Sequence, residues 1–128
     1  YEIASCLVGS EMCIRDSSKA LDVTTNLMQA HSKATGIFAE NDEMAIGAIS
    51  ALGSKAGQSA KVVGFDGTAD GIKAVKAGTM GATIAQQPAL LGKTAVDQAA
   101  DILAGKQVSK TTPIKVVLVT KDNAKDYE

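Results

Sequence analysis

The stretch that most constrains how this chain can fold is KVVGFDGT, residues 61–68. A short apolar run leads into a carboxylate between two glycines, and a helical pattern follows from Thr68. This pattern is typical of a buried strand that feeds a helix. Ligands of open α/β sheets bind outside the carboxyl ends of the strands. We therefore expect Asp66 to face a cleft, since Gly64 and Gly67 keep side-chain bulk away from the backbone on either side of it.

Helical and strand patterns alternate along the rest of the chain. Strands are predicted at residues 36–40, 61–65, 80–85 and 114–120. Helices are predicted from residue 18, from the Asn41-Asp42-Glu43 segment, over 69–77 and over 89–104, and a polar tail from Lys121 is expected to fray. This order predicts an α/β fold with a mainly parallel sheet.

Two of the predicted helices each have one apolar face. In the second helix the expected core residues are Met44, Ile46 or Gly47, Ile49 and Leu52. In the last helix one face is shared by Leu91, Ala95, Ala99 and Ile102.

Length and charge exclude several classes of function. The 128 residues make at most one ordinary domain, and the net charge of −1 comes with no basic block, so no nucleic-acid partner is expected. No apolar run is long enough for membrane insertion. Cys6 and Cys13 match no zinc spacing, and His31 is distant from both, so neither a metal site nor a cofactor is expected.

Motifs that resemble catalytic or ion-binding elements are incomplete. Gly92-Lys93-Thr94 resembles the end of a phosphate-binding loop, but Gln87 stands where a glycine is required. The calcium-loop pattern that starts at Asp66 reaches Ala77 where a bidentate Glu is needed. No G-x-S-x-G is present, and no nucleophile–base pair stands out. We therefore expect no catalytic residues and no enzyme.

Three polar residues follow predicted strands and precede predicted helices: Asn41, Asp66 and Gln86. Each also has a local interpretation, in which Asn41 caps a helix, Asp66 makes an Asx-turn, and Gln86 or Gln87 caps the helix at Pro88. Together they predict a row of hydrogen-bonding groups along one edge of the sheet. A carboxylate and two amides without an acid–base partner suit a hydroxyl-rich ligand.

The first part of the chain reads differently. Residues 7–16, LVGSEMCIRD, resemble a translated sequencing-library adapter, and residues 1–17 fit neither helical nor strand periodicity. We therefore expect residues 1–17 to be a non-native segment and exclude them from functional reasoning. The alternative is a real strand near its beginning.

From residue 18 to about residue 121 the chain resembles the C-terminal part of ribose-binding-protein-like, type I periplasmic sugar-binding proteins. The motifs that carry this are IFAENDEMAIGAISAL, VVGFDGTADGIKAVKAGTMGATIAQQP and IKVVLVTKDN, in order. The resemblance implies part of a three-layer α/β lobe over residues 18–128 and a monosaccharide, ribose-like ligand. It carries sugar contacts to Asn41, Asp66 and Gln86. It also implies the membrane subunits of an ABC importer as partners, and the periplasm or cell envelope as the location.

The same resemblance implies that the chain is a truncated reading frame that has lost a signal peptide and most of one lobe. The helix over 89–104 would then lack the sheet that it normally covers, and its apolar face would pack elsewhere or stay exposed. The alternative function is the sugar-sensing domain of a lac-type repressor, which shares this fold. The sequence upstream of residue 18 would decide between them, by a signal peptide or a helix-turn-helix.

Overall fold

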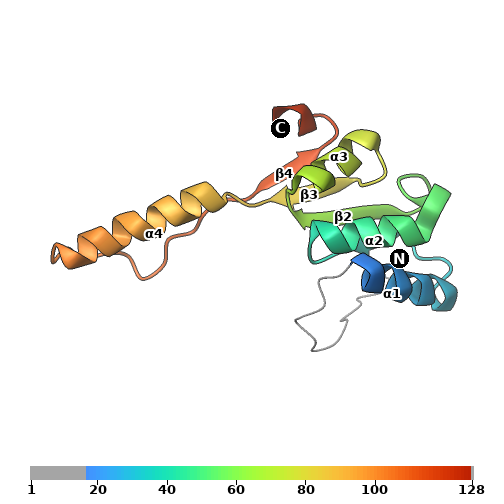
Figure 1. Cartoon of the computed structure of the whole chain (residues 1–128), viewed down its shortest axis with the longest axis horizontal. Coiled ribbons are helices and arrows are strands. Elements are labelled where there is room, and N and C mark those ends of the chain that lie inside the picture. The colour runs from blue at the N-terminus through green and yellow to red at the C-terminus, as the bar shows by residue number, and fades with distance from the viewer. Residues whose placement is uncertain (1–16, 128) are drawn as a thin grey trace. The chain divides into compact units, whose positions relative to one another are not determined.

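The computed structural model describes residues 17–127, which fall into two compact units (Figure 1). Unit 1 is Tyr1–Ala85 with Leu118–Glu128, and unit 2 is Gln86–Val117. The elements are α1 (Ser17–Ala30), β1 (Gly36–Phe38), α2 (Asp42–Leu52), η1 (Gly53–Lys55), β2 (Lys61–Asp66), α3 (Ala69–Ala77), β3 (Ala82–Ala85), α4 (Pro88–Leu103), β4 (Val117–Thr120) and η2 (Ala124–Asp126). None of the helices in the described part of the chain is long and apolar enough to cross a membrane.

The sheet has the strand order β1-β2-β3-β4. Strand β2 pairs in parallel with β1, where Ile37 lies opposite Val62, and with β3, where Asp66 lies opposite Ala85. Because these three strands run the same way, their carboxyl ends meet at one edge of the sheet. The predicted α/β class with a mainly parallel sheet is confirmed.

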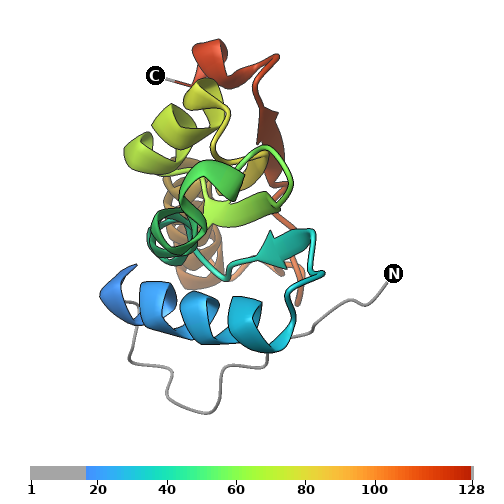
Figure 2. The same cartoon turned by 90° about the vertical axis from the view of Figure 1, so that its right-hand side faces the viewer.

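The helices of unit 1 that contact strands lie on one face of the sheet. Helix α2 packs on β2, α3 packs on β3, and α1 packs on α2. Figure 2 shows α2 and α3 on the same side of the strands. Alternation along β2 turns the buried Val62 and Gly64 toward these helices, while Val63 and Phe65 on the other face are half-buried. The described residues of unit 1 therefore contain one of the two helical layers that the three-layer lobe implies.

The predicted core face of α2 is only partly right. Leu52 and Gly47 are buried as expected, but Met44, Ile46 and Ile49 are half-buried. The buried face is instead made of small residues and one acid, namely Asp42, Ala45, Gly47, Ala48 and Leu52. The reason is close packing on two sides: a Cβ on Gly47 would lie 2.1 Å from the backbone oxygen of Ser17 in α1. Helix α2 is squeezed between α1 and the sheet, so small side chains form its core.

The two ends of unit 1 differ from the sequence prediction. Helix α1 begins at Ser17, while residues 1–16, with Cys6 and Cys13, lie outside the described residues, so the non-native segment remains a prediction. The closing strand is shorter than residues 114–120 and covers Val117–Thr120. The tail predicted to fray instead forms η2, whose Ala124 is fully buried and which contacts α3.

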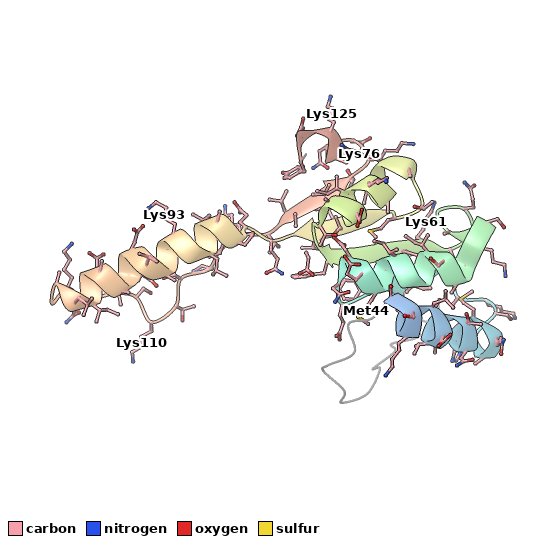
Figure 3. All side chains as sticks on the ribbon, in the orientation of Figure 1. Met44, Lys61, Lys76, Lys93, Lys110 and Lys125 are labelled. Carbon is pink, nitrogen blue, oxygen red and sulfur yellow. The ribbon has the colours of Figure 1, made fainter. Side chains whose placement is uncertain are left out.

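Unit 2 consists of α4 and the segment that follows it. Helix α4 has no buried residue over its 16 positions. Side chains project around it on all sides in Figure 3, where Lys93 marks its middle part. Its exposed apolar side chains include Leu91, 54% exposed, and Ile102, 57% exposed, both from the predicted apolar face.

Candidate functional site

Asn41 is the N-cap of α2, in the loop that follows β1. Its side chain is 6% exposed, and its Oδ1 accepts a hydrogen bond of 2.8 Å from the backbone N–H of Met44. The local interpretation of Asn41 as a helix cap is therefore confirmed. The capping bond uses only the carbonyl oxygen, so it does not occupy the two N–H donors of the amide nitrogen.

Asp66 is the last residue of β2, at the carboxyl end where a ligand contact was predicted. It is half-buried and has a φ of 112°, in the region that glycine favours. Among the described non-glycine residues it is the one with a positive φ. Such a conformation costs on the order of 1–3 kcal/mol and persists only where the surroundings hold it in place.

Gly67 continues this unusual backbone with a φ of 73°. A Cβ at this position would lie 2.4 Å from the Cβ of Ala85 in β3, so the turn fits against the neighbouring strand only with a glycine. The backbone N–H of Gly67 donates to Oγ1 of Thr83, also in β3, at 3.2 Å. The residue that follows the strained Asp66 is therefore held against β3 by both packing and a hydrogen bond.

The carboxylate of Asp42 is the centre of a buried hydrogen-bond network. Asp42 is fully buried at the first position of α2. Its Oδ1 accepts from Oγ1 of Thr83 at 2.6 Å, and its Oδ2 accepts from the backbone N–H of Thr68 at 2.7 Å and from Oγ1 of Thr68 at 3.2 Å. Thr68 in turn caps α3 by accepting from the N–H of Gly71 at 3.1 Å. The carboxylate thus joins the starts of α2 and α3 to β3, and the positive ends of both helices favour its negative charge.

Two glycines make room for this carboxylate. A Cβ on Gly64 of β2 would lie 2.3 Å from Oδ1 of Asp42, and a Cβ on Gly71 of α3 would lie 2.1 Å from Oδ2. Gly64 was predicted to keep bulk away from Asp66, but its contacts assign it to the Asp42 pocket.

From the sequence, Asp42 was placed only in the segment that opens a helix. The signal that could have found its role is the pair of threonines, Thr68 after the GFDG turn and Thr83 within a predicted strand, together with the glycines at 64 and 71.

Gln86 directly follows Ala85 of β3 and belongs to unit 2, where it is exposed. Its neighbour Gln87 is the N-cap residue of α4 but makes no side-chain capping bond. Instead, Nε2 of Gln87 donates to the backbone oxygen of Lys115 at 2.6 Å. The interpretation of Gln87 as a side-chain cap is therefore wrong, and the sugar contact assigned to Gln86 stays a prediction.

The incomplete motifs lie on regular structure. Gly92, Lys93 and Thr94 sit inside α4, as predicted. Within residues 17–127 no group of three or more His, Cys, Asp or Glu side chains is placed to hold a metal ion. A cavity of about 370 Å³ lies between α2 and α3, where Ile46, Ile49, Asp70 and Lys73 line it, and none of the three predicted ligand residues takes part.

Comparison with known proteins identifies relatives of this chain among periplasmic binding proteins. The family model for the periplasmic binding protein domain matches residues 7–107. The ribose import binding protein of Haemophilus influenzae is 46% identical over 106 residues, which are 83% of this chain and 36% of that protein. The D-allose-binding periplasmic protein of Escherichia coli is 44% identical over 90 residues, 69% of this chain and 29% of that protein.

A solved structure of a periplasmic solute-binding protein has a similar fold. An ABC transporter periplasmic solute-binding protein from Actinobacillus succinogenes, with bound D-allose, matches with a TM-score of 0.81 and 34% identity, over 88% of this chain and 41% of that one. The chain thus spans between 29% and 41% of the length of these relatives. It belongs to the periplasmic binding protein domain family and forms part of one such domain.

Proposed function

We propose that the complete protein containing this segment binds a monosaccharide, ribose-like in the arrangement of its hydroxyls, as the solute receptor of an ABC importer. The relatives named for ribose and D-allose binding support this ligand class. So does the structural neighbour that holds D-allose. The receptor works in the periplasm or cell envelope with the importer's membrane subunits and without nucleic acid.

The observation that carries the proposal is the strained carboxylate at a strand end. Asp66 ends β2 with a φ of 112°, at the edge where ligands bind in open α/β sheets. Backbone strain of this kind clusters at ligand-binding sites, because the surrounding fold holds a side chain in an orientation that it would not adopt alone.

Each of the three residues has a distinct role in the proposed site. Asp66 accepts from two adjacent sugar hydroxyls, which are charge-assisted and therefore strong hydrogen bonds. Asn41 donates from its amide nitrogen while its oxygen continues to cap α2. Gln86 is assigned from the IAQ motif and its place directly after β3. The carboxylate of Asp66 has no acid–base partner in this set, and we therefore propose that the protein releases its ligand unchanged and is not an enzyme.

The test is calorimetry on the complete protein with D-ribose, followed by D-allose and other monosaccharides. Asp66→Ala should weaken binding of the best ligand about tenfold to a hundredfold, since a hydrogen bond to a charged group contributes about 1.5–3 kcal/mol. Asn41→Ala should weaken binding less, because its contact is neutral. The matched control is Asp70→Ala, which removes an exposed carboxylate four residues further along.

Two results would contradict the proposal. One is a wild-type protein that binds no monosaccharide; the other is an Asp66→Ala variant that binds the best ligand as tightly as wild type does. The alternative, a sugar-sensing repressor domain, has no support among the named relatives, which are binding proteins for import or for the periplasm. A helix-turn-helix encoded upstream of residue 18 would support the repressor alternative instead.

A further inference from the structure

We infer that Asp42, which is fully buried, is a positioning residue for the ligand contact at Asp66 and sets ligand affinity without touching the ligand. This inference rests on the proposed function of Asp66. It follows from the direction of the hydrogen bonds between the two residues, from the glycines that enclose the carboxylate, and from the strained backbone between them.

All hydrogen bonds of the network run toward Asp42. The N–H of Gly67 donates to Oγ1 of Thr83, and the hydroxyl of Thr83 then donates to Oδ1 of Asp42. On the other branch, the N–H of Gly71 donates to Oγ1 of Thr68, whose hydroxyl and backbone N–H both donate to Oδ2. An ionised Asp has two oxygens that accept hydrogen bonds and no donor, whereas Asn has only one such oxygen. Among side chains of this size, Asp can therefore accept the final hydrogen bond of both branches.

The first branch reaches the residue next to Asp66. Because the Thr83 hydroxyl is fixed by Asp42, it presents its lone pair to the N–H of Gly67. The second branch fixes the N–H of Thr68, one residue further along. On its other side, Asp66 is fixed by pairing with Ala85. The backbone of the strained residue is therefore held from both directions, and on the side that follows it both hydrogen-bonded branches end at Asp42.

The burial of Asp42 separates this role from direct binding. With no exposed surface, its carboxylate cannot reach a ligand in solution. A Cβ at Gly64 or Gly71 would overlap one of the carboxylate oxygens, so the carboxylate can occupy this position only because both residues are glycines. A ligand site needs its contacts held within about 0.5 Å, which buried supporting hydrogen bonds provide. Affinity should thus depend on the Asp42–Thr83 bond.

The decisive variants alter hydrogen bonds of the network while keeping the size and shape of the side chain. Thr83→Val removes the hydroxyl that joins Gly67 to Asp42 while keeping the shape of the side chain, and Thr83→Ser keeps the hydroxyl. Asp42→Asn replaces one acceptor oxygen by a donor. The control is Leu52→Ala, at the far end of α2, where Leu52 is 6% exposed and takes no part in the network. All are made in the complete protein, with sugar affinity by calorimetry and Tm by calorimetric unfolding.

Thr83→Val and Asp42→Asn should weaken binding of the best sugar about tenfold, the size of one lost supporting hydrogen bond of about 1.4 kcal/mol. Thr83→Ser should restore affinity to within about threefold of wild type. Leu52→Ala should lower Tm without changing affinity. If Thr83→Val and Asp42→Asn lower Tm as Leu52→Ala does while affinity stays at the wild-type value, the positioning role is wrong and Asp42 only stabilises the fold.

A second readout separates this inference from the proposed function. Amide hydrogen exchange at Gly67, measured without ligand, should speed up about tenfold in Thr83→Val and Asp42→Asn but not in Thr83→Ser, whereas exchange at Thr68 should speed up only in Asp42→Asn. If the wild-type protein binds no sugar, the proposed function fails and this exchange decides the inference alone. Unchanged exchange at Gly67 would overturn it. If Asp66→Ala weakens binding but the network variants do not, the proposed function stands without the positioning role.

Discussion

Helices α2 and α4 carry similar apolar side chains but differ completely in burial. Five of the 11 residues of α2 are buried, whereas none of the 16 residues of α4 is. Helix α2 lies between α1 and the sheet, and small residues on both sides allow close contact. Helix α4 has Leu90, Leu91, Val96 and Ile102 exposed. An apolar pattern in the sequence therefore predicts that a helix forms. Whether its apolar side chains are buried depends on a second surface of the protein that packs against them.

We expect the partner surface of α4 to lie in parts of the complete protein beyond the residues described. An apolar face of this size on a soluble domain usually marks an interface. The family resemblance predicts that this face covers a second sheet. The predictions that follow compare positions in the two helices and their surroundings, ordered by expected effect.

The largest effect is expected for Gly71→Ala, because its new Cβ would lie 2.1 Å from Oδ2 of Asp42. Overpacking and the loss of the carboxylate's hydrogen bonds should together lower the free energy of unfolding by about 4 kcal/mol. Gly92→Ala, inside α4 with nothing within 4 Å of the added Cβ, should instead stabilise the helix by about 0.5–1 kcal/mol. Urea titrations followed by circular dichroism measure both. Equal effects of the two substitutions would show that unit 1 is not packed as described.

A second pair compares truncations of leucine. Leu52→Ala at the end of α2 should cost about 2–4 kcal/mol, since a cavity replaces a buried side chain. Leu103→Ala in α4, where the side chain is 89% exposed, should change stability by less than about 0.5 kcal/mol. Chemical denaturation of the two variants at one temperature tests this. A large loss from Leu103→Ala would mean that α4 has a partner within this chain.

The third prediction concerns the apolar face of α4. In this chain Leu91→Lys should change stability by less than about 0.5 kcal/mol, because Leu91 is 54% exposed. In the complete protein the same substitution should cost about 2 kcal/mol or more, since it would bury a charge against the second sheet. Ala100→Lys, nine residues or two and a half turns further along and so on the opposite face, is the control and should be tolerated in both. Tolerance of Leu91→Lys in the complete protein would refute the assigned packing of α4.

The smallest effect is expected from removing residues 1–16. If these residues are a non-native segment, their deletion should change Tm by less than about 4 °C, corresponding to less than about 1 kcal/mol. The deletion must stop before Ser17, whose backbone oxygen packs against Gly47. Differential scanning calorimetry of the shortened chain measures the change, and a larger loss would make the segment part of the fold.

Much of the fold was predictable because local patterns and tertiary structure agree. Helix α3 runs from Ala69 to Ala77 as predicted, with Thr68 as cap and Gly78 in the left-handed conformation after it. The strand before it was also placed correctly and is one residue longer at Asp66. In both cases the signals are short-range: a capping hydroxyl, a glycine and an apolar run.

The misses occurred where packing between elements decides the outcome. The sequence favoured Met44, Ile46 and Ile49 as the core of α2, because large apolar residues usually are buried. The fold instead needed small residues there, since α1 and β2 approach from opposite sides. Asp42 was missed for the same reason: its partners, Thr68 and Thr83, are 26 and 41 residues away along the chain. Of the candidate site, Asp66 lies at the end of its strand as expected, whereas β1 ends three residues before Asn41, and only the structure shows the strain at Asp66.

The Asp42 network also has an evolutionary consequence. Thr68 and Thr83 are hydrogen-bonded to Asp42 in a space bounded by Gly64 and Gly71. Replacing one of these residues would leave buried polar groups of the others without a hydrogen-bond partner, which lowers stability. In an alignment of relatives, these five positions should change together or not at all, whichever sugar is bound. Residues that touch the ligand should instead change independently of these five as the bound sugar changes. We therefore expect the Asp42 network to be shared by relatives that bind different sugars.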